Sequence, residues 1–446
     1  MSQTETNPLA RDFGTLSLIR FALPGMVMML FMGLYTVVDT LFVARFVNTD
    51  ALSAINIVCP VINLIVGLGT MLAAGGSAVI ARDMGAGEHR RASARFTQIV
   101  LFGGCLGLLL AAAGLLCFPQ ILRFLGASGR LWAGCKAYLG TLLLFLPATF
   151  LQTLFASFFV AAGRPGLGSA LSIGAGMLNL VLDVVFMKYC GLGVRGAALG
   201  TGLGQMVPAL AGLWFFSRRK QAPAFCRPSR APDVLMKSCS NGASELVGQL
   251  AAAVTTCLLN RAMLSLRGAD GVAALTILIY AQFLFSTACL GFSMGVSPII
   301  SFQLGEGNPA RVRRTVLDCL ELVAGVSAAG FLAAWCGSAG LTAFFAAPGS
   351  AVYLLAVEGF RIFSVSFLFC GVNLFTSALF TALSDGKISA LLSFLRTFCF
   401  LTAGILLLPR VLGVAGLWLA VPLAEAAAFA VSGCCLARLA RKLRAA

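Results

Sequence analysis

Long apolar stretches alternate with short polar segments along almost the whole chain, from residue 14 to residue 436. Each stretch reaches the roughly 20 residues that a helix needs to cross the hydrocarbon core of a bilayer. We place twelve of them, at 14–44, 52–81, 96–118, 131–160, 166–187, 193–216, 239–265, 272–303, 315–345, 352–382, 388–409 and 411–436. The pattern predicts an all-α integral membrane protein with twelve transmembrane helices.

An internal repeat divides these helices into two sets of six. When the chain is shifted by 220 residues, identical residues coincide across most of both halves. The coinciding glycines include Gly75 with Gly295, Gly85 with Gly305 and Gly193 with Gly413. Six is an even number of crossings, so both halves have the same orientation in the membrane. Such parallel repeats are typical of secondary transporters, in which the substrate path lies between the halves. An old duplication without a transport role is the alternative.

The longest polar segment supports the same division of the chain. Residues 217–237 contain six Lys or Arg and three Pro, and they fall near the middle of the sequence. We expect an N-terminal lobe (N-lobe) at 14–216 and a C-terminal lobe (C-lobe) at 238–436, joined by this cytoplasmic linker. A cytoplasmic N-terminal segment, 1–13, and a cytoplasmic tail, 437–446, complete the predicted organisation.

Composition narrows the class of protein. Of the 446 residues, 59% are apolar and only 11% are charged, and the mean hydropathy is +0.95. Soluble domains average about 45–50% apolar and about 25% charged residues, so an ordinary soluble enzyme and a disordered chain are excluded. The fifteen cysteines lie mostly within apolar stretches and form no CxxC motif. We therefore expect neither a disulfide framework nor a cysteine metal site.

The net charge of +16 comes from basic residues between the apolar stretches. If both termini are cytoplasmic, the cytoplasmic segments hold 21 Lys or Arg and the outer loops hold nine. An excess of basic residues on the cytoplasmic side is the rule for membrane proteins. We expect a multi-pass protein of the cell (inner or plasma) membrane with both termini in the cytoplasm, and no nucleic-acid partner.

Two acidic residues lie inside apolar spans, where a charge is expensive and is by default a functional candidate. Asp39 lies in the first span and Asp183 in the fifth, where Asn179 shares its helix face. Thr201 follows in the sixth span. At about 1.5 Å per helical residue, these side chains share one depth, roughly 8–9 Å from the outer helix ends.

Two carboxylates, an amide and a hydroxyl at one depth suit Na⁺ or a shared proton. We expect Asp39, Asn179, Asp183 and Thr201 to form the cation-coupling site, and to be the metal ligands if the ion is Na⁺. The alternative is that the acids only complete hydrogen-bond networks within the bundle. The positions 220 residues further on are Leu259, Cys399, Ala403 and Val421. The prediction therefore places a cation site in the N-lobe alone.

Soft and polar side chains elsewhere in the spans predict a substrate cavity. Methionine and aromatic surfaces adapt to bulky ligands, and aromatic rings attract cations. We expect the cavity to be lined by Met28, Met32 and Tyr35 of the first span, Phe155 of the fourth, Glu245 of the seventh, and Tyr280 and Gln282 of the eighth. A salt bridge within the bundle is the alternative for Glu245, and core or lipid-facing positions are the alternative for the others.

Three further residues stand out within the spans. Pro24 removes a backbone hydrogen bond from the first span, so we expect a hinge fifteen residues before Asp39, with a static kink as the alternative. Arg396 lies midway along the eleventh span and needs an acid or a helix end as its partner. The sequence gives Glu425, in the last span, no clear partner.

At these residues the sequence resembles the MATE family, the multidrug and toxic compound extrusion transporters, and within it the bacterial MepA-like branch. The resemblance extends from about Arg11 to Arg438. It rests on Pro24, Val38-Asp39-Thr40, Gly85-Ala86-Gly87, Ala162-Gly163-Arg164-Pro165 and the pair Asn179 and Asp183. It implies a twelve-helix antiporter with two six-helix lobes and a V-shaped cavity. Such proteins expel organic, often cationic, drugs by using inward flux of Na⁺ or H⁺.

The resemblance also implies roles for individual residues. In the family, an Asp, an Asn, a second Asp and a Thr form the N-lobe cation site, and they match Asp39, Asn179, Asp183 and Thr201. Tyr35 matches a tyrosine that lines this site. Met32 stands where some members carry a polar residue. Asn373 lies near a position where some members carry an acid, which puts a C-lobe cation site in doubt.

We therefore expect a secondary active multidrug efflux antiporter, not an enzyme. It would act as a monomer on small organic substrates within the bilayer, with no cofactor beyond the coupling Na⁺ or H⁺. A lipid-linked oligosaccharide flippase of related fold is the alternative within transport. It would need several cationic residues in the cavity, where only Arg396 and Arg361 qualify. A membrane-embedded enzyme would need clustered His, Asp or Cys, and the single histidine, His89, lies in a basic loop.

Overall fold

The computed structural model describes residues 8–445 apart from 48, 128, 130 and 229–232. Most of the predicted N-terminal segment 1–13 therefore lies outside the described residues, and so do four residues of the predicted linker 217–237. Two arginines that entered the charge count, at positions 130 and 230, are also outside them.

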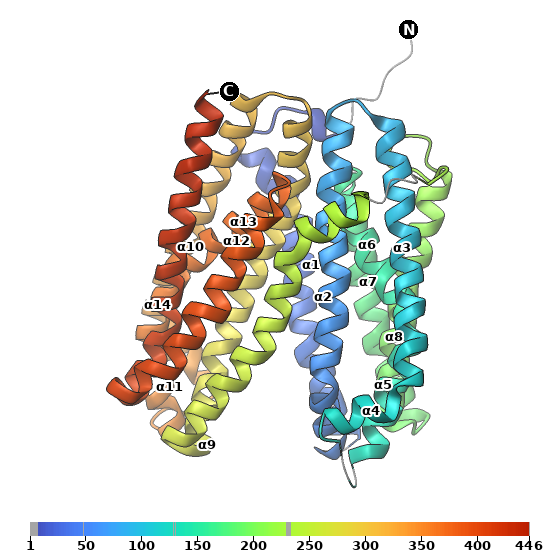
Figure 1. Ribbon diagram of the computed structural model, residues 1–446. Coiled ribbons are helices and arrows are strands. Elements are labelled where there is room, and N and C mark those ends of the chain that lie inside the picture. The colour runs from blue at the N-terminus through green and yellow to red at the C-terminus, as the bar shows by residue number, and fades with distance from the viewer. Residues whose placement is uncertain (1–7, 48, 128, 130, 229–232, 446) are drawn as a thin grey trace.

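Helices make up nearly all of the described chain (Figure 1). The first half consists of η1 (Pro8–Ala10), α1 (Thr15–Phe46), α2 (Thr49–Gly85), α3 (His89–Leu116), α4 (Phe118–Phe124), α5 (Leu131–Leu144), α6 (Leu146–Ala161), α7 (Pro165–Asp183), η2 (Val184–Tyr189) and α8 (Gly193–Arg218). The second half consists of α9 (Asp233–Gly305), α10 (Pro309–Ala343), α11 (Ala351–Phe363), α12 (Val365–Ala382), α13 (Gly386–Phe394), η3 (Leu395–Leu401) and α14 (Thr402–Ala445).

The helices form the twelve crossings that the sequence predicts. Nine helical segments of the described chain are long and apolar enough to span a membrane, or ten if α5 and α6, bent by 56°, are one span. Helices α9 and α14 are each broken by a glycine with positive φ, Gly268 and Gly413, and each folds back on itself (Figure 1). Counting both limbs of these two helices brings the crossings to twelve. The all-α, twelve-helix prediction is confirmed.

Backbone conformation reveals the internal repeat as clearly as the sequence does. Gly193 and Gly413 coincide in the repeat, and their φ values are 55° and 58°. Gly87 and Gly307 also coincide, with φ values of 77° and 73°. Only glycine adopts this left-handed region at no steric cost, so these turns need glycine in both halves.

The two lobes meet through glycines at matching positions of the repeat. Gly85 at the end of α2 lies so close to the backbone carbonyl of Phe302 in α9 that a Cβ would collide with it. Gly305 has the same relation to the carbonyl of Arg82. Each residue of the first pair is 220 positions from its counterpart in the second. A local two-fold axis therefore passes between α2 and α9.

A second symmetric pair of contacts lies further along the same helices. A Cβ on Gly75 would collide with the first turns of α9, where Gly242 lies. A Cβ on Gly295 would lie 2.9 Å from Cα of Ala22 in α1. The small residues let the backbones of the two lobes approach closely, which is how helices in membranes maximise their packing.

Buried apolar clusters show where the lobes are joined and where they are separate. The largest cluster draws on both lobes and includes Leu72 and Phe292. A second cluster contains N-lobe residues only, from Val43 to Ala198, and a third contains C-lobe residues only, from Leu259 to Val421. The lobes are thus joined at the end that carries the described chain ends, which we call the terminal side. They separate toward the opposite side, where the ribbons diverge in Figure 1.

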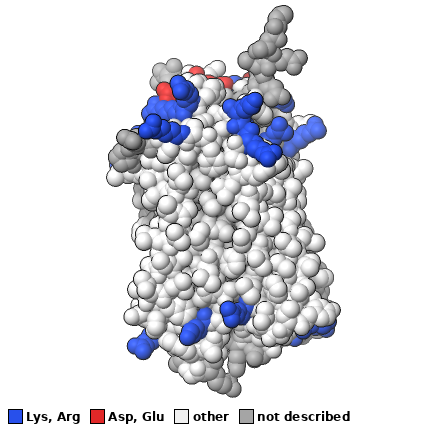
Figure 2. All heavy atoms as spheres, turned by 90° about the vertical axis from the view of Figure 1, so that its right-hand side faces the viewer, with Lys and Arg blue, Asp and Glu red and all other residues white. Residues whose placement is uncertain are grey.

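The outer surface has the polarity of a membrane protein. Figure 2 shows a broad band of uncharged residues on the N-lobe face, between two zones of Lys and Arg. Large apolar side chains such as Leu108, Leu109 and Leu116 are 64%, 65% and 80% exposed on α3. In lipid such exposure carries no penalty, so the protein is a multi-pass membrane protein.

Candidate functional site

Three helices bring the four predicted cation ligands of the N-lobe together. Asn179 and Asp183 lie at the end of α7, Asp39 lies in the second half of α1, and Thr201 lies in α8. Nδ2 of Asn179 is 3.4 Å from Oδ1 of Asp183 and 3.3 Å from Oγ1 of Thr201. The carboxyl groups of Asp39 and Asp183 lie within hydrogen-bonding reach of each other. We call these four residues the N-lobe cluster.

The N-lobe cluster contains more acceptors than donors. Three of its buried oxygen atoms, Oδ1 of Asp39, Oδ1 of Asn179 and Oδ2 of Asp183, have no hydrogen-bond partner among the described residues. Buried polar atoms are nearly always paired, so unpaired acceptors on two neighbouring carboxyl groups need an explanation. A bound cation or a proton would satisfy them, and an all-oxygen ligand set suits a hard cation such as Na⁺.

Close packing of α8 against α7 shapes the cluster. A Cβ on Gly200 would collide with Oδ1 of Asp183 and lie 3.2 Å from Nδ2 of Asn179. Asp183 is fully buried, and Asn179 is 2% exposed. The sequence analysis missed Gly200. Its role is to leave room for Asp183 and Asn179 of α7, and a missing side chain gives no signal in the sequence.

Irregular backbone follows the cluster directly. At Asp183, helix α7 gives way to the π-helix η2. Single π-turns are rare within helices and occur often at functional sites. The hydroxyl of Tyr35 lies within hydrogen-bonding reach of Thr201. Tyr35 therefore belongs beside the cation cluster, as the resemblance implies, and not to the substrate cavity that we also assigned it to.

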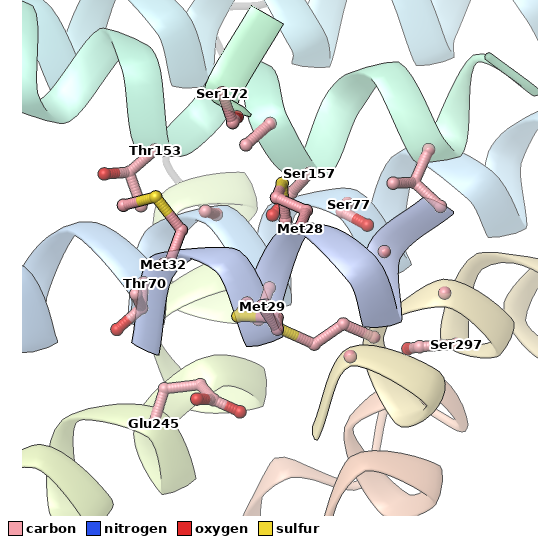
Figure 3. Close-up of a pocket in the computed structure, with 18 of the residues that line it drawn as sticks. Met28, Met29, Met32, Thr70, Ser77, Thr153, Ser157, Ser172, Glu245 and Ser297 are labelled. Atoms are coloured by element: carbon pink, nitrogen blue, oxygen red, sulfur yellow. The ribbon is translucent and has the colours of Figure 1, made fainter. Parts of the chain in front are cut away.

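A cavity of about 320 Å³ lies between the lobes, in the range of pockets that hold small molecules. Its wall combines Met28, Met29 and Met32 of α1 with residues of α2, α6, α7, α9 and α12. Glu245 of α9 is the only charged side chain among the described residues that line it. Figure 3 shows Glu245 across the cavity from Ser157 and Ser172, with the methionines of α1 between them.

Besides Tyr35, three of the predicted cavity residues lie elsewhere. Phe155 is fully buried in the N-lobe core, where its ring stacks on Phe216 at a centroid distance of 5.6 Å. Tyr280 and Gln282 do not line this cavity, and Tyr280 is 42% exposed. The assignment of Phe155 to the cavity is therefore wrong, because a run of aromatics does not reveal which helix face meets the other lobe.

Hydroxyl and amide side chains of the cavity wall were missed by the sequence analysis. They include Thr70, Ser77, Thr153, Ser157, Ser172 and Gln249. Thr153 and Ser157 are four residues apart on α6 and so share a helix face. This spacing is the signal that a sequence analysis could have used. Glu245 forms no salt bridge with any described residue, contrary to the alternative of a pair within the bundle.

The C-lobe contains a buried polar network of the opposite character. Nε of Arg396 donates to Oε1 of Glu425 at 2.8 Å, and Nδ2 of Asn373 donates to Oε2 at 2.8 Å. The hydroxyl of Ser432 completes it by donating to Oδ1 of Asn373 at 3.0 Å. Glu425 therefore has the partner that the sequence could not assign. Its carboxylate is balanced by an arginine of the protein itself.

These features define a class of protein. Two six-helix lobes, related by a parallel repeat and joined at one end, enclose a cavity with one acidic side chain among its described residues. The N-lobe also contains a separate cluster rich in hydrogen-bond acceptors. This is the architecture of a secondary transporter with its substrate path between the lobes.

Comparison with known proteins identifies the family. The MatE family model matches residues 24–185 and 246–404, one match in each lobe, and the chain belongs to this family. Its members are transporters, so the choice of a transporter over an enzyme is confirmed.

Individual relatives cover nearly the whole chain. Multidrug export protein MepA of Staphylococcus saprophyticus is 22% identical over 405 residues, which are 90% of this chain and 87% of that protein. MepA of Staphylococcus haemolyticus is 23% identical over 375 residues, 83% of this chain and 82% of that protein. A structure described as the outward-facing conformation of a multidrug resistance MATE family transporter has a TM-score of 0.92 at 22% identity, and covers 100% of both chains. The predicted resemblance to MATE and MepA proteins is confirmed.

Proposed function

We propose that this protein is a multidrug efflux antiporter, which exports organic, often cationic, compounds in exchange for Na⁺ or H⁺. It acts as a monomer in the cell (inner or plasma) membrane, with the terminal side in the cytoplasm. The basic residues concentrated at that side favour this orientation. In this orientation the joined lobes close the cavity toward the cytoplasm, and the described conformation faces outward.

One observation carries the proposal: helix α1 contributes to both candidate sites. Met28, Met29 and Met32 line the cavity, and Asp39 lies about two turns further along, in the N-lobe cluster. Any change in the position or shape of α1 therefore acts on both sites at once. This is the physical requirement for exchange of one ligand against the other.

The cavity residues bind the substrate, and the N-lobe cluster binds the coupling cation. Methionine side chains are flexible and polarisable, so the α1 wall adapts to ligands of different shape. Glu245 attracts a positive group, and the surrounding hydroxyls accept or donate hydrogen bonds. The N-lobe cluster takes up Na⁺ or H⁺. Cation uptake removes a net charge from a buried site, which stabilises one arrangement of α1 relative to the other.

The flippase alternative is less well supported. An anionic pyrophosphate-linked substrate needs basic side chains in the cavity, and no Lys or Arg is among the described residues that line it. Arg396 is paired with Glu425. Arg361, the other candidate, is likewise absent from the lining.

Reconstituted vesicles would test the proposal. We expect ethidium, an organic cation, to be moved only when an inward Na⁺ gradient or an inward H⁺ gradient is imposed. Glu245→Gln should weaken ethidium transport, and Glu321→Gln, an exposed acid on α10, serves as the control. Transport that continues at full rate without either gradient would contradict antiport.

A further inference from the structure

A second cavity lies on the terminal side of the N-lobe, and Pro165 is the only described residue that lines both it and the inter-lobe cavity. It measures about 1350 Å³ and is lined by η1, the start of α1, the loop before α7, and the end of α8 with the residues that follow it. Six of its lining residues are basic: Arg11, Arg20, Arg164, Arg218, Arg219 and Lys220. We call this the basic cleft. Figure 2 shows Lys and Arg gathered at this end of the N-lobe face.

The positive charge of the basic cleft is not neutralised by the described residues. Asp12 is the only acid among the described lining residues, and its carboxylate lies 3.1 Å from Arg311, a residue of α10 outside the cleft. None of the six basic residues forms a salt bridge with a described carboxylate. Like charges held together without a counter-charge repel one another, and a bound anion relieves this repulsion.

The guanidinium of Arg219 is held in place within the cleft by hydrogen bonds and an aromatic ring. Its guanidinium donates to the backbone carbonyls of Ala162, at 3.2 Å, and Gln221, at 3.1 Å, and it lies over the ring of Phe215. Burial and the neighbouring charge of Arg164 lower the pKa of Arg219 from its usual value. The local environment is therefore positively charged before any ligand binds.

The position of the basic cleft relative to the bilayer favours a lipid. Trp214 lines it, is 60% exposed, and carries Arg218 over its ring at 5.2 Å. Tryptophan is enriched where the hydrocarbon core meets the headgroups, and arginine beside it reaches the phosphate level. Basic pockets between transmembrane helices on the cytoplasmic side bind the headgroups of anionic lipids.

We propose that the basic cleft binds the phosphate headgroup of an anionic phospholipid from the leaflet on the terminal side. The elements that form it give this site a mechanical role. Helices α1, α7 and α8, whose terminal-side ends line the cleft, are the three helices that carry the N-lobe cluster at their other ends. A headgroup bridging these ends would hold them together and stabilise the N-lobe.

Lipid titration of the purified full chain in neutral detergent would test the proposal. We expect phosphatidylglycerol to raise the unfolding temperature and to remain bound in native mass spectrometry, whereas phosphatidylcholine does neither. In Arg164→Gln/Arg218→Gln, half-saturation should need about 30-fold more phosphatidylglycerol. Each basic side chain near an anionic membrane surface contributes about 1 kcal/mol, or about fivefold in affinity. Arg20→Gln/Lys220→Gln is a second variant, should the first fail to fold.

The control removes the same charge from other basic positions on the terminal side. Arg90→Gln/Arg314→Gln changes two exposed arginines outside the cleft and should bind phosphatidylglycerol like the unmodified protein. Equal weakening in the control and cleft variants would overturn the proposal, because it would indicate diffuse surface attraction. An equal stabilisation by inorganic phosphate alone would overturn the lipid assignment in favour of a free-phosphate site. An equal response to phosphatidylcholine would also overturn it.

Discussion

At the scale of single residues, Asp39 and Asp183 are the two acids whose chemistry decides the coupling. They lie within hydrogen-bonding reach of each other, and each has one buried oxygen without a described partner. We expect Asp39→Asn and Asp183→Asn each to reduce gradient-driven efflux to the level of protein-free vesicles, because an amide neither titrates nor carries the charge that binds Na⁺. Thermal unfolding should show both variants folded. Efflux by either variant at the unmodified rate would exclude these acids from coupling.

Arg396 and Glu425 contrast with the two aspartates of the N-lobe cluster, because here an arginine of the protein balances the buried carboxylate. Breaking a buried pair by removing one partner costs about 3–5 kcal/mol, whereas replacing both partners costs much less. We expect Arg396→Gln and Glu425→Gln each to lower the unfolding temperature strongly, and Arg396→Gln/Glu425→Gln to restore most of the loss. A double variant as unstable as the two single losses combined would show that the pair is not the main interaction of either residue.

How far these sites can be predicted from sequence depends on how local the signal is. Asn179 and Asp183 share a helix face by spacing alone, and Asp39 and Thr201 join them through a depth argument, so the N-lobe cluster is predictable. Arg396 and Glu425 are on different crossings, and nothing in their spacing identifies them as partners. The assignment of Phe155 to the cavity was wrong because the sequence shows that a helix is apolar but not which of its faces meets the other lobe.

At the scale of elements, helix α1 is the candidate moving part. It stays helical from Thr15 to Phe46 although Pro24 lacks a backbone donor. We expect Pro24→Ala, which restores the donor, to slow turnover about tenfold, equivalent to about 1.4 kcal/mol in the barrier. Ethidium affinity should stay unchanged. Stopped-flow efflux with equilibrium binding separates the two effects.

A matched proline serves as the control for that experiment. Pro60 lies inside α2 and is exposed, so Pro60→Ala should leave turnover unchanged. If Pro24→Ala turns over at the unmodified rate, flexing of α1 at Pro24 is not part of the cycle. Coupling would then have to run through rigid rocking of the two lobes.

The contact of α2 with α9 determines how tightly the terminal side closes. Gly75→Ala would place a methyl group against the backbone of α9, and overpacking of this kind destabilises by about 1–3 kcal/mol. We expect faster hydrogen exchange at the terminal-side end of α2 and the start of α9. Gly325→Ala in α10, where a Cβ meets nothing within 4 Å, should not change the exchange there. Equal protection in both variants would show that the lobes are not held together at this contact.

At the scale of the whole molecule, the two lobes share one architecture but differ in their buried charges. The N-lobe cluster has acidic oxygens without a described partner, whereas the buried acid of the C-lobe, Glu425, is paired with Arg396. The architecture is predictable from sequence, because span length and a constant offset of 220 residues are properties of the chain itself. The breaks at Gly268 and Gly413 lie at or next to boundaries between predicted spans, whereas the bend between α5 and α6 and the separation of the lobes come from packing between distant segments. The same packing produces the inter-lobe cavity, whose polar wall is assembled from six helices.

We propose that a cation in the N-lobe cluster and an organic cation in the inter-lobe cavity exclude each other through α1. Ethidium binding to the purified protein, measured across Na⁺ concentration and across pH, tests it directly, because coupling between two sites must be reciprocal. We expect that raising Na⁺ or lowering pH weakens ethidium binding by the unmodified protein, and that Asp183→Asn removes this dependence. Ethidium affinity that responds to neither cation, or that responds equally in Asp183→Asn, would show that the N-lobe cluster and the cavity are not coupled.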